Sequence, residues 1–131
     1  MSRTTGRCEC GAVAFSVPTT ALRPTVTHCH CSQCRRTSGH VWASTHAPFD
    51  ALDFTDDAGL TWFASSADAT RGFCNRCGSS LFYRSKDEEG VGIAAGCLDD
   101  TTGLSTGKHI HVADKGTYYE IADGAPQFDT Y

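Results

Sequence analysis

The grouping of the cysteines constrains this chain more than any other feature of its sequence. The 131 residues contain eight cysteines, and all but one lie in short clusters. The clusters are Cys8-x-Cys10, Cys29-x-Cys31-x-x-Cys34 and Cys74-x-x-Cys77, and Cys97 stands alone. A disulfide framework spreads its cysteines to connect distant segments, whereas zinc ligands come in closely spaced pairs. The spacing therefore favours metal binding over a disulfide scaffold.

Two of the clusters share a local sequence, "CECGAVAFSV" and "CNRCGSSLFY". In each, a glycine follows the cysteine pair and a strand-like segment comes next, which is typical of a zinc knuckle. The thiols lie on a tight turn, the glycine tolerates the positive φ of that turn, and backbone N–H groups can point at the sulfur atoms. Two facing knuckles supply four thiolates, the ligand set of a structural zinc site. The sequence thus predicts one structural zinc bound by Cys8, Cys10, Cys74 and Cys77.

The third cluster offers three thiols, Cys29, Cys31 and Cys34, and lacks a glycine after its last cysteine. Three protein ligands with an open fourth position are typical of a catalytic zinc site. Because three ligands on one short loop bind less tightly than a cage of four thiolates, we expect this second zinc to be weaker and exchangeable. The candidates for a fourth protein ligand are His28, His30, His40 and Cys97.

Alternation along an extended segment argues against the two neighbouring histidines as ligands. If residues 27–31 are extended, Cys29 and Cys31 point to one side and His28 and His30 to the other. We therefore expect these histidines at the surface or supporting the site from behind. Cys97 is equally well explained as a small buried apolar residue.

Four arginines lie close to the clusters in sequence: Arg35, Arg36, Arg71 and Arg76. They could offset the negative charge of thiolates or hold the carboxylates of an anionic substrate, and the alternative is ordinary solvated surface charge. Four large aromatic side chains are expected in the core rather than as a substrate platform: Trp42, Trp62, Phe73 and Phe82.

The remaining pattern predicts a single all-β domain spanning residues 1–131. Short alternating segments indicate strands, turn-rich pieces separate them, and no segment has a long helical period. Strands are predicted at 12–17, 40–45, 51–54, 60–63, 80–84, 91–95, 108–112 and 117–121. The only helix expected is a short turn after Cys34.

Charge and hydropathy exclude several classes of protein. The net charge is −4 and no basic stripe is present, which argues against nucleic-acid binding. No apolar run approaches the ~20 residues of a membrane-spanning helix. The N-terminal "MSRTTGRCEC" lacks the apolar core of a secretory signal, so a cytoplasmic location is the expectation.

The motifs together resemble a known family. "GRCECGAVAF", "HCHCSQCRRTSG", "RGFCNRCGSSLF", "AGCLDD" and "HIHVADKGTYYEIADGAPQF" follow one another from Gly6 to Phe128. In this order they resemble the glutathione-dependent formaldehyde-activating enzyme family, also called the centromere-protein-V domain family. The chain departs from the family pattern in having Cys97 where Thr or Ser is usual, and in lacking a Trp near Tyr118.

The resemblance implies a fold, two metal sites and an activity. The fold would be a β-tent of stacked antiparallel sheets with little helix. One zinc would be structural, at the two knuckles, and a second would lie at the C-x-C-x-x-C cluster. The family's activity joins glutathione and formaldehyde into S-hydroxymethylglutathione, a carbon–sulfur lyase reaction run in reverse. A carboxylate of glutathione could then be received by Arg35 or Arg36.

Three functional interpretations follow. The leading one is a zinc-dependent carbon–sulfur lyase acting on an adduct of a small thiol such as glutathione. The second is a non-catalytic zinc module that binds a partner, which a fourth protein ligand on the second zinc would favour. The third is a thiol redox or detoxification protein, which a disulfide between Cys31 and Cys34 would favour.

Overall fold

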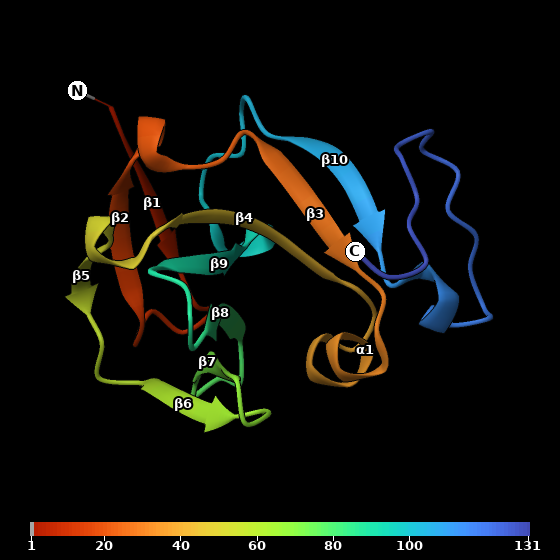
Figure 1. The fold of residues 1–131 in the computed structure, drawn as a ribbon. Helices are drawn as coiled ribbons and strands as arrows, with labels where there is room; N and C mark the ends of the chain where they lie inside the picture. Colours follow the sequence, from red (N-terminus) through yellow and green to blue (C-terminus); the bar gives the residue numbers. More distant parts are fainter. Residues whose placement is uncertain (1) are drawn as a thin grey trace.

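The computed structural model describes residues 2–131 as two β-sheets with one short α-helix (Figure 1). The smaller sheet has the order β1-β2-β5, with β1 (Arg3–Arg7), β2 (Ala14–Pro18) and β5 (Asp53–Asp56). The larger sheet has the order β10-β3-β4-β9-β8-β7-β6. Its strands are β3 (Thr25–Cys29), β4 (Trp42–Pro48), β6 (Leu60–Ala64), β7 (Ala69–Cys74), β8 (Ser80–Ser85), β9 (Gly90–Ala94) and β10 (Ser105–Ile110). The helices are α1 (Ser32–Ser38) and the 3-10 helices η1 (Thr19–Ala21), η2 (Phe49–Ala51), η3 (Ala95–Cys97) and η4 (Val112–Asp114).

The predicted all-β class is confirmed, with three local differences. Strands β1, β3 and β7 were not among the predicted strands, and the strand predicted at 117–121 is wrong. The backbone of this segment joins no sheet. The hydroxyl groups of its two tyrosines contact the rings of His30 and His40 instead. Strand β10 also pairs parallel to β3, against the expectation of purely antiparallel sheets. A parallel pair needs a long crossover, and most of the chain runs between these two strands.

The core lies between the two sheets. Strand β2 alternates as expected, burying Phe15 and Val17 and leaving Ser16 partly exposed. Its inward face meets the larger sheet, where the rings of Phe15 and Phe82 lie 5.4 Å apart between centroids. Burying a side chain of this size stabilises the fold by roughly 1.5–3 kcal/mol. The predicted core position of Phe82 is therefore confirmed.

Helix α1 connects β3 to β4 and is a short, capped element. Cys31 is its N-cap, and the Cys31 sulfur accepts a hydrogen bond from the backbone N–H of Cys34 at 3.3 Å. Gly39, with φ of 85°, ends the helix in the left-handed conformation. The helix thus begins before Cys34, not after it as the sequence suggested, because the Cys31 sulfur serves as its cap. None of the helices formed by residues 2–131 is long and apolar enough to cross a lipid bilayer.

Candidate metal centres

The first cysteine group brings together both predicted knuckles. The sulfur atoms of Cys8, Cys10, Cys74 and Cys77 all lie within 4.8 Å of one another. Cys10 Sγ is 3.7 Å from both Cys8 Sγ and Cys74 Sγ. A Zn–S bond of about 2.3 Å gives a tetrahedron with an S–S edge of about 3.8 Å, so this spacing fits a zinc ion and is too long for a disulfide.

The knuckle geometry is the one that the glycines predicted. Gly11 and Gly78 have φ angles of 84° and 81°. Backbone N–H groups point at the buried sulfur atoms: Val13 donates to Cys8 Sγ at 3.3 Å, and Arg76 donates to Cys74 Sγ at 3.4 Å. These contacts stabilise sulfur in its anionic form, the form that binds metal.

A third segment, which the sequence did not single out, closes the space between the knuckles. The Gly59 N–H donates to the Ala12 carbonyl at 3.0 Å, and its carbonyl accepts from the Asn75 N–H at 2.8 Å. A Cβ on Gly59 would lie 2.8 Å from Cys74 Sγ and 3.0 Å from the Ala12 side chain. The turn before β6 therefore fits only with glycine at this position.

The second cysteine group is built from three consecutive elements. Cys29 ends β3, Cys31 caps α1, and Cys34 lies in the first turn of α1. Their sulfur atoms lie within 4.8 Å of one another, and no other His, Cys, Asp or Glu among residues 2–131 joins the group. Three thiols are suitable ligands for zinc, and they leave its fourth position without a protein donor. This three-cysteine group is called the triad below.

A pocket of about 360 Å³ opens onto the triad. Trp42 lies directly opposite Cys29 across the β3–β4 pair, and Ile110 lies opposite it on β10. The remaining wall comes from near neighbours of the triad, Thr27 and Gln33, and from more distant parts of the chain: Ser44, Arg71, Tyr83, His111 and Tyr131. The predicted burial of Trp42 is confirmed, and its ring also forms part of this wall.

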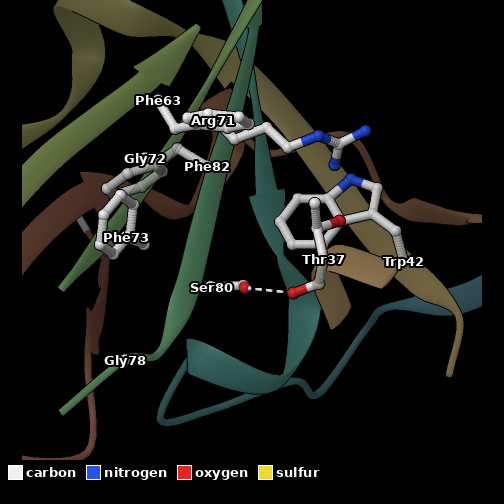
Figure 2. A pocket seen from close by; sticks show the side chains of 9 residues that line it. All are labelled: Thr37, Trp42, Phe63, Arg71, Gly72, Phe73, Gly78, Ser80 and Phe82. Atoms are coloured by element: carbon white, nitrogen blue, oxygen red, sulfur yellow. Dashed lines mark hydrogen bonds between the residues drawn. The ribbon is translucent and has the colours of Figure 1, made fainter. Parts of the chain in front are cut away.

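A second, smaller cavity of about 230 Å³ shares Trp42 and Arg71 with the triad pocket. Figure 2 shows its lining, in which aromatic side chains such as Phe63 and Phe82 predominate. The Ser80 hydroxyl donates to the Thr37 carbonyl at 2.9 Å, which joins β8 to α1 at the edge of the cavity. Trp42 and Arg71 therefore border both spaces.

Arg71 contacts the triad directly. It comes from β7, is only 7% exposed, and its Nη2 donates to Cys34 Sγ at 3.5 Å. The hydrogen bond from Cys29 and the neighbouring Arg71 guanidinium together lower the pKa of Cys34 to about 6, although burial opposes the shift. The same Cys29–Cys34 contact, together with burial, raises the pKa of Cys29. Of this pair, Cys34 is thus the thiol that becomes anionic more readily.

The histidines near the triad form a separate hydrogen-bonded chain. Asp123 accepts from His109 Nε2 at 2.7 Å, and His109 Nδ1 lies 2.9 Å from His30 Nε2. The Tyr119 hydroxyl contacts His30 Nδ1. Because a carboxylate only accepts, the chain with neutral rings runs from Tyr119 through His30 and His109 to Asp123. Burial and the neighbouring His109 lower the pKa of His30 to about 4, which keeps its ring neutral.

The four candidates for a fourth triad ligand all lie elsewhere in the structure. His30 is buried, so a surface position for it is wrong, although it points away from the triad as the alternation predicted. His28 contacts the Thr106 hydroxyl, His40 contacts Tyr118, and Cys97 is partly buried against the main core. None of the four joins the triad.

The predicted arginines are placed differently from one another. Arg35 and Arg36 lie on α1 and do not line the triad pocket. Arg35 Nε is buried without a hydrogen-bond partner among the described residues, and Arg36 is exposed. Arg76 is exposed, whereas Arg71 reaches the triad. Four pocket residues were missed. Gln33 lies within the cysteine motif itself, whereas Tyr83, His111 and Tyr131 belong to no local motif that marks them.

Comparison with known proteins agrees with this arrangement. A family model described as glutathione-dependent formaldehyde-activating enzyme matches residues 3–114, which include both cysteine groups. A protein of Schizosaccharomyces pombe named as an uncharacterized lyase is 25% identical over 130 residues, covering 94% of this chain and 88% of that protein.

A solved structure supports the fold. The crystal structure of a Rhodobacter sphaeroides protein is similar to this chain with a TM-score of 0.58 and 22% sequence identity. The match covers 95% of this chain and 98% of the other. At this level of identity the similarity concerns the fold alone.

Proposed function

The chain belongs to the glutathione-dependent formaldehyde-activating enzyme family, and from this premise we propose that it is a zinc-dependent carbon–sulfur lyase. Its substrate is an adduct of a small thiol and an aldehyde, with S-hydroxymethylglutathione as the leading candidate. The name of the S. pombe relative supports a lyase reaction. Cys29, Cys31 and Cys34 are the catalytic ligands in this proposal, and the four-cysteine group is structural.

The observation that carries the proposal is the triad's lack of a fourth protein donor. Among the described residues only three donors meet at this position, and all three line a pocket. A closed four-ligand site would have favoured the binding-module interpretation. The pocket of about 360 Å³ falls within the range of ordinary small-molecule sites.

The chemistry requires a thiolate next to an aldehyde. A zinc ion bound by the triad would supply an open position for the substrate sulfur and lower the pKa of that thiol. In the synthetic direction the sulfur lone pair forms a bond to the aldehyde carbon, the carbonyl π bond breaks, and its oxygen takes up a proton. The lyase direction breaks the same C–S bond, returning the electron pair to sulfur and the hydroxyl proton to solvent. No oxidant or reductant is consumed.

The protein residues orient and shield the reacting groups. Trp42, Tyr83 and Ile110 provide an apolar wall that excludes water from the triad side of the pocket. Arg35 and Arg36 remain our proposal for the remote carboxylates of glutathione. Arg35 supports this role with a buried Nε that lacks a partner among residues 2–131.

Cobalt substitution tests the proposal. The cobalt-loaded protein is titrated with glutathione, with cysteine and with S-methylglutathione, which has no free thiol. Sulfur-to-cobalt charge-transfer absorption should grow with the two thiols and stay unchanged with the thioether. In parallel, exchange between glutathione, formaldehyde and their adduct is measured by NMR with the zinc protein, and the protein should accelerate it.

Matched cysteine variants assign the signal. Cys31→Ser should abolish both the thiol-dependent increase in charge-transfer absorption and the acceleration without unfolding the chain. Cys97→Ser removes a thiol outside both groups and should change neither. If no added thiol perturbs the wild-type cobalt spectrum, the lyase proposal fails and a non-catalytic zinc module replaces it.

A further inference from the structure

Arg71 is a buried cation without a carboxylate partner. Its side chain is 7% exposed. Among residues 2–131, carboxylate oxygens lie within 4.0 Å of a basic side-chain nitrogen only in the pairs His46–Glu88 and His109–Asp123, so no carboxylate lies that close to the Arg71 guanidinium. Buried charges are normally paired, because a cation loses much of its hydration when it leaves water. The groups that surround the Arg71 guanidinium are therefore uncharged side chains and the sulfur of Cys34.

The groups around the guanidinium hold it in one position. The Gln33 side-chain oxygen accepts from Arg71 Nε at 3.1 Å and from Nη2 at 2.8 Å. Gln33 is fixed in turn, because its amide nitrogen donates to the Ser65 carbonyl at 3.0 Å. The Arg71 Cζ atom also lies 4.8 Å from the centre of the Tyr83 ring. These contacts are all with neutral groups, so they orient the charge without cancelling it.

The remaining contact is with the triad, through Arg71 Nη2 and Cys34 Sγ at 3.5 Å. Three thiolates around a divalent ion carry a net charge of −1. A neutral fourth ligand leaves that charge unchanged, whereas a thiolate ligand raises it to −2. A second negative charge in a buried site is costly unless a cation is close by.

We propose that Arg71 is the residue that makes the triad selective for anionic sulfur ligands over neutral ones. Its fixed guanidinium offsets the charge that a substrate thiolate adds, and Gln33 holds it against Cys34. Arg71 is a positioning and specificity residue, since its contact is with a ligand of the metal. The inference rests on the proposed function, because it concerns which ligand takes the open position.

The prediction is a change in ligand preference rather than a general loss of binding. Arg71→Met removes the charge and retains much of the apolar stem. In the cobalt protein, it should weaken glutathione binding about tenfold, while imidazole, a neutral ligand, should bind within about twofold of wild type. Arg71→Lys keeps the charge without the fork geometry and should recover part of the preference for glutathione.

Two further variants keep the test decisive. Gln33→Glu places a carboxylate beside the intact Arg71 and should weaken glutathione relative to imidazole in the same way, even if Arg71→Met does not fold. Arg84→Met is the matched control, because Arg84 lies over the Phe49 ring, with its Cζ 3.9 Å from the ring centre, and lines neither the triad pocket nor the cavity of Figure 2. It should leave both affinities unchanged.

The outcomes separate this inference from the proposed function. The role of Arg71 would be overturned if Arg71→Met lost glutathione and imidazole affinity equally. It would also be overturned if Arg71→Met and Gln33→Glu both bound glutathione as tightly as the wild type. A wild-type protein that binds imidazole but no thiol would overturn the lyase proposal itself. A selective loss of glutathione affinity in the Arg71→Met or Gln33→Glu protein supports both.

Discussion

At the scale of single residues, the surroundings of Cys77 and Cys97 shift the pKa of the same thiol group in opposite directions. The Ser79 hydroxyl and nearby backbone N–H groups lower the pKa of Cys77 to about 5. Burial and the neighbouring Asp99 carboxylate raise the pKa of Cys97 to about 12. Cys77 is therefore prepared to bind metal as a thiolate, whereas Cys97 stays a neutral thiol packed against the core.

Removing one knuckle thiol should destabilise the whole protein. Cys77→Ser leaves three ligands at the structural group, and a structural zinc contributes about 10 kcal/mol or more to folding. We expect a loss of several kcal/mol, seen as a lower melting temperature together with the loss of about one zinc per chain. Cys97→Ser serves as the control with both metals retained. A Cys77→Ser protein that melts like the wild type would refute the structural assignment.

At the scale of elements, short connections rather than the strands themselves shape both cysteine groups. The knuckles turn at Gly11 and Gly78, and α1 begins on the Cys31 sulfur. The turn that ends at Gly59 lies between the two knuckles and hydrogen-bonds to both. These connections set the sulfur positions, so small backbone changes there should affect metal binding.

Gly59→Ala tests this coupling between a turn and a metal site. A Cβ would lie 2.8 Å from Cys74 Sγ, and neither knuckle backbone can yield without moving a ligand. We expect a destabilisation of about 1–3 kcal/mol, typical of overpacking, and faster zinc loss to a chelator.

Gly96→Ala is the control for that substitution, since nothing lies within 4 Å of a Cβ at Gly96. Its stability and zinc release should match those of the wild type. Equal behaviour of the two glycine variants would show that Gly59 has no special role.

The C-terminal segment is a second element whose attachment can be tested, by pH. It pairs with β10 through backbone hydrogen bonds of His109 with Pro126 and Phe128, both at 2.9 Å, and through the hydrogen bond from His109 Nε2 to the Asp123 carboxylate at 2.7 Å. The Ala125 N–H and the His109 side chain lower the pKa of the Asp123 carboxyl. A carboxyl whose folded pKa is lowered stabilises the fold above its unfolded pKa of about 3.9, and this contribution disappears as the pH falls through the folded value.

Asp123→Asn should therefore melt at a lower temperature than the wild type at pH 7. The difference between the two melting temperatures should narrow below about pH 4 and disappear at lower pH, because the wild-type carboxyl is then protonated and uncharged, like the amide of the variant. Thermal melts across this range measure it. A difference that stays constant down to pH 2 would indicate that the charge of Asp123 is not the cause.

At the scale of the whole molecule, the two cysteine groups connect different lengths of chain. The structural group joins residues 8–10 to residues 74–77 and so links the start of the fold to the β7–β8 connection, one strand from the edge of the larger sheet. The triad lies within residues 29–34, on β3 and α1, and closes no long loop. Loss of metal from the first should therefore affect folding, and loss from the second should not.

Mild chelation should separate the two sites. A weak chelator should remove about one metal per chain, from the triad, while the far-UV circular dichroism spectrum and the melting temperature change little. Stronger chelation should remove the second metal together with the folded structure. Simultaneous loss of both metals with unfolding, at every chelator strength, would contradict the assignment of a weaker, exchangeable triad.

Local sequence was sufficient wherever neighbouring residues determine the geometry. The knuckle turns follow from cysteine pairs ended by Gly11 and Gly78, and the direction of His30 away from the triad follows from strand alternation. The all-β class follows from the short alternating segments. In each case the interacting groups lie within a few residues, so the pattern of residue types carries the information.

Tertiary structure decided everything that depends on strand register and packing. Arg71 is 37 positions from Cys34 and His109 is 79 positions from His30, and no spacing rule connects them. The parallel pairing of β10 with β3 likewise depends on a crossover that no local pattern encodes. The sequence alone thus identified which thiols gather into groups that could hold a metal ion. Only the folded sheet brought a buried cation, Trp42 and Tyr83 around the three thiols that lack a fourth ligand, because those contacts exist only once distant strands are paired.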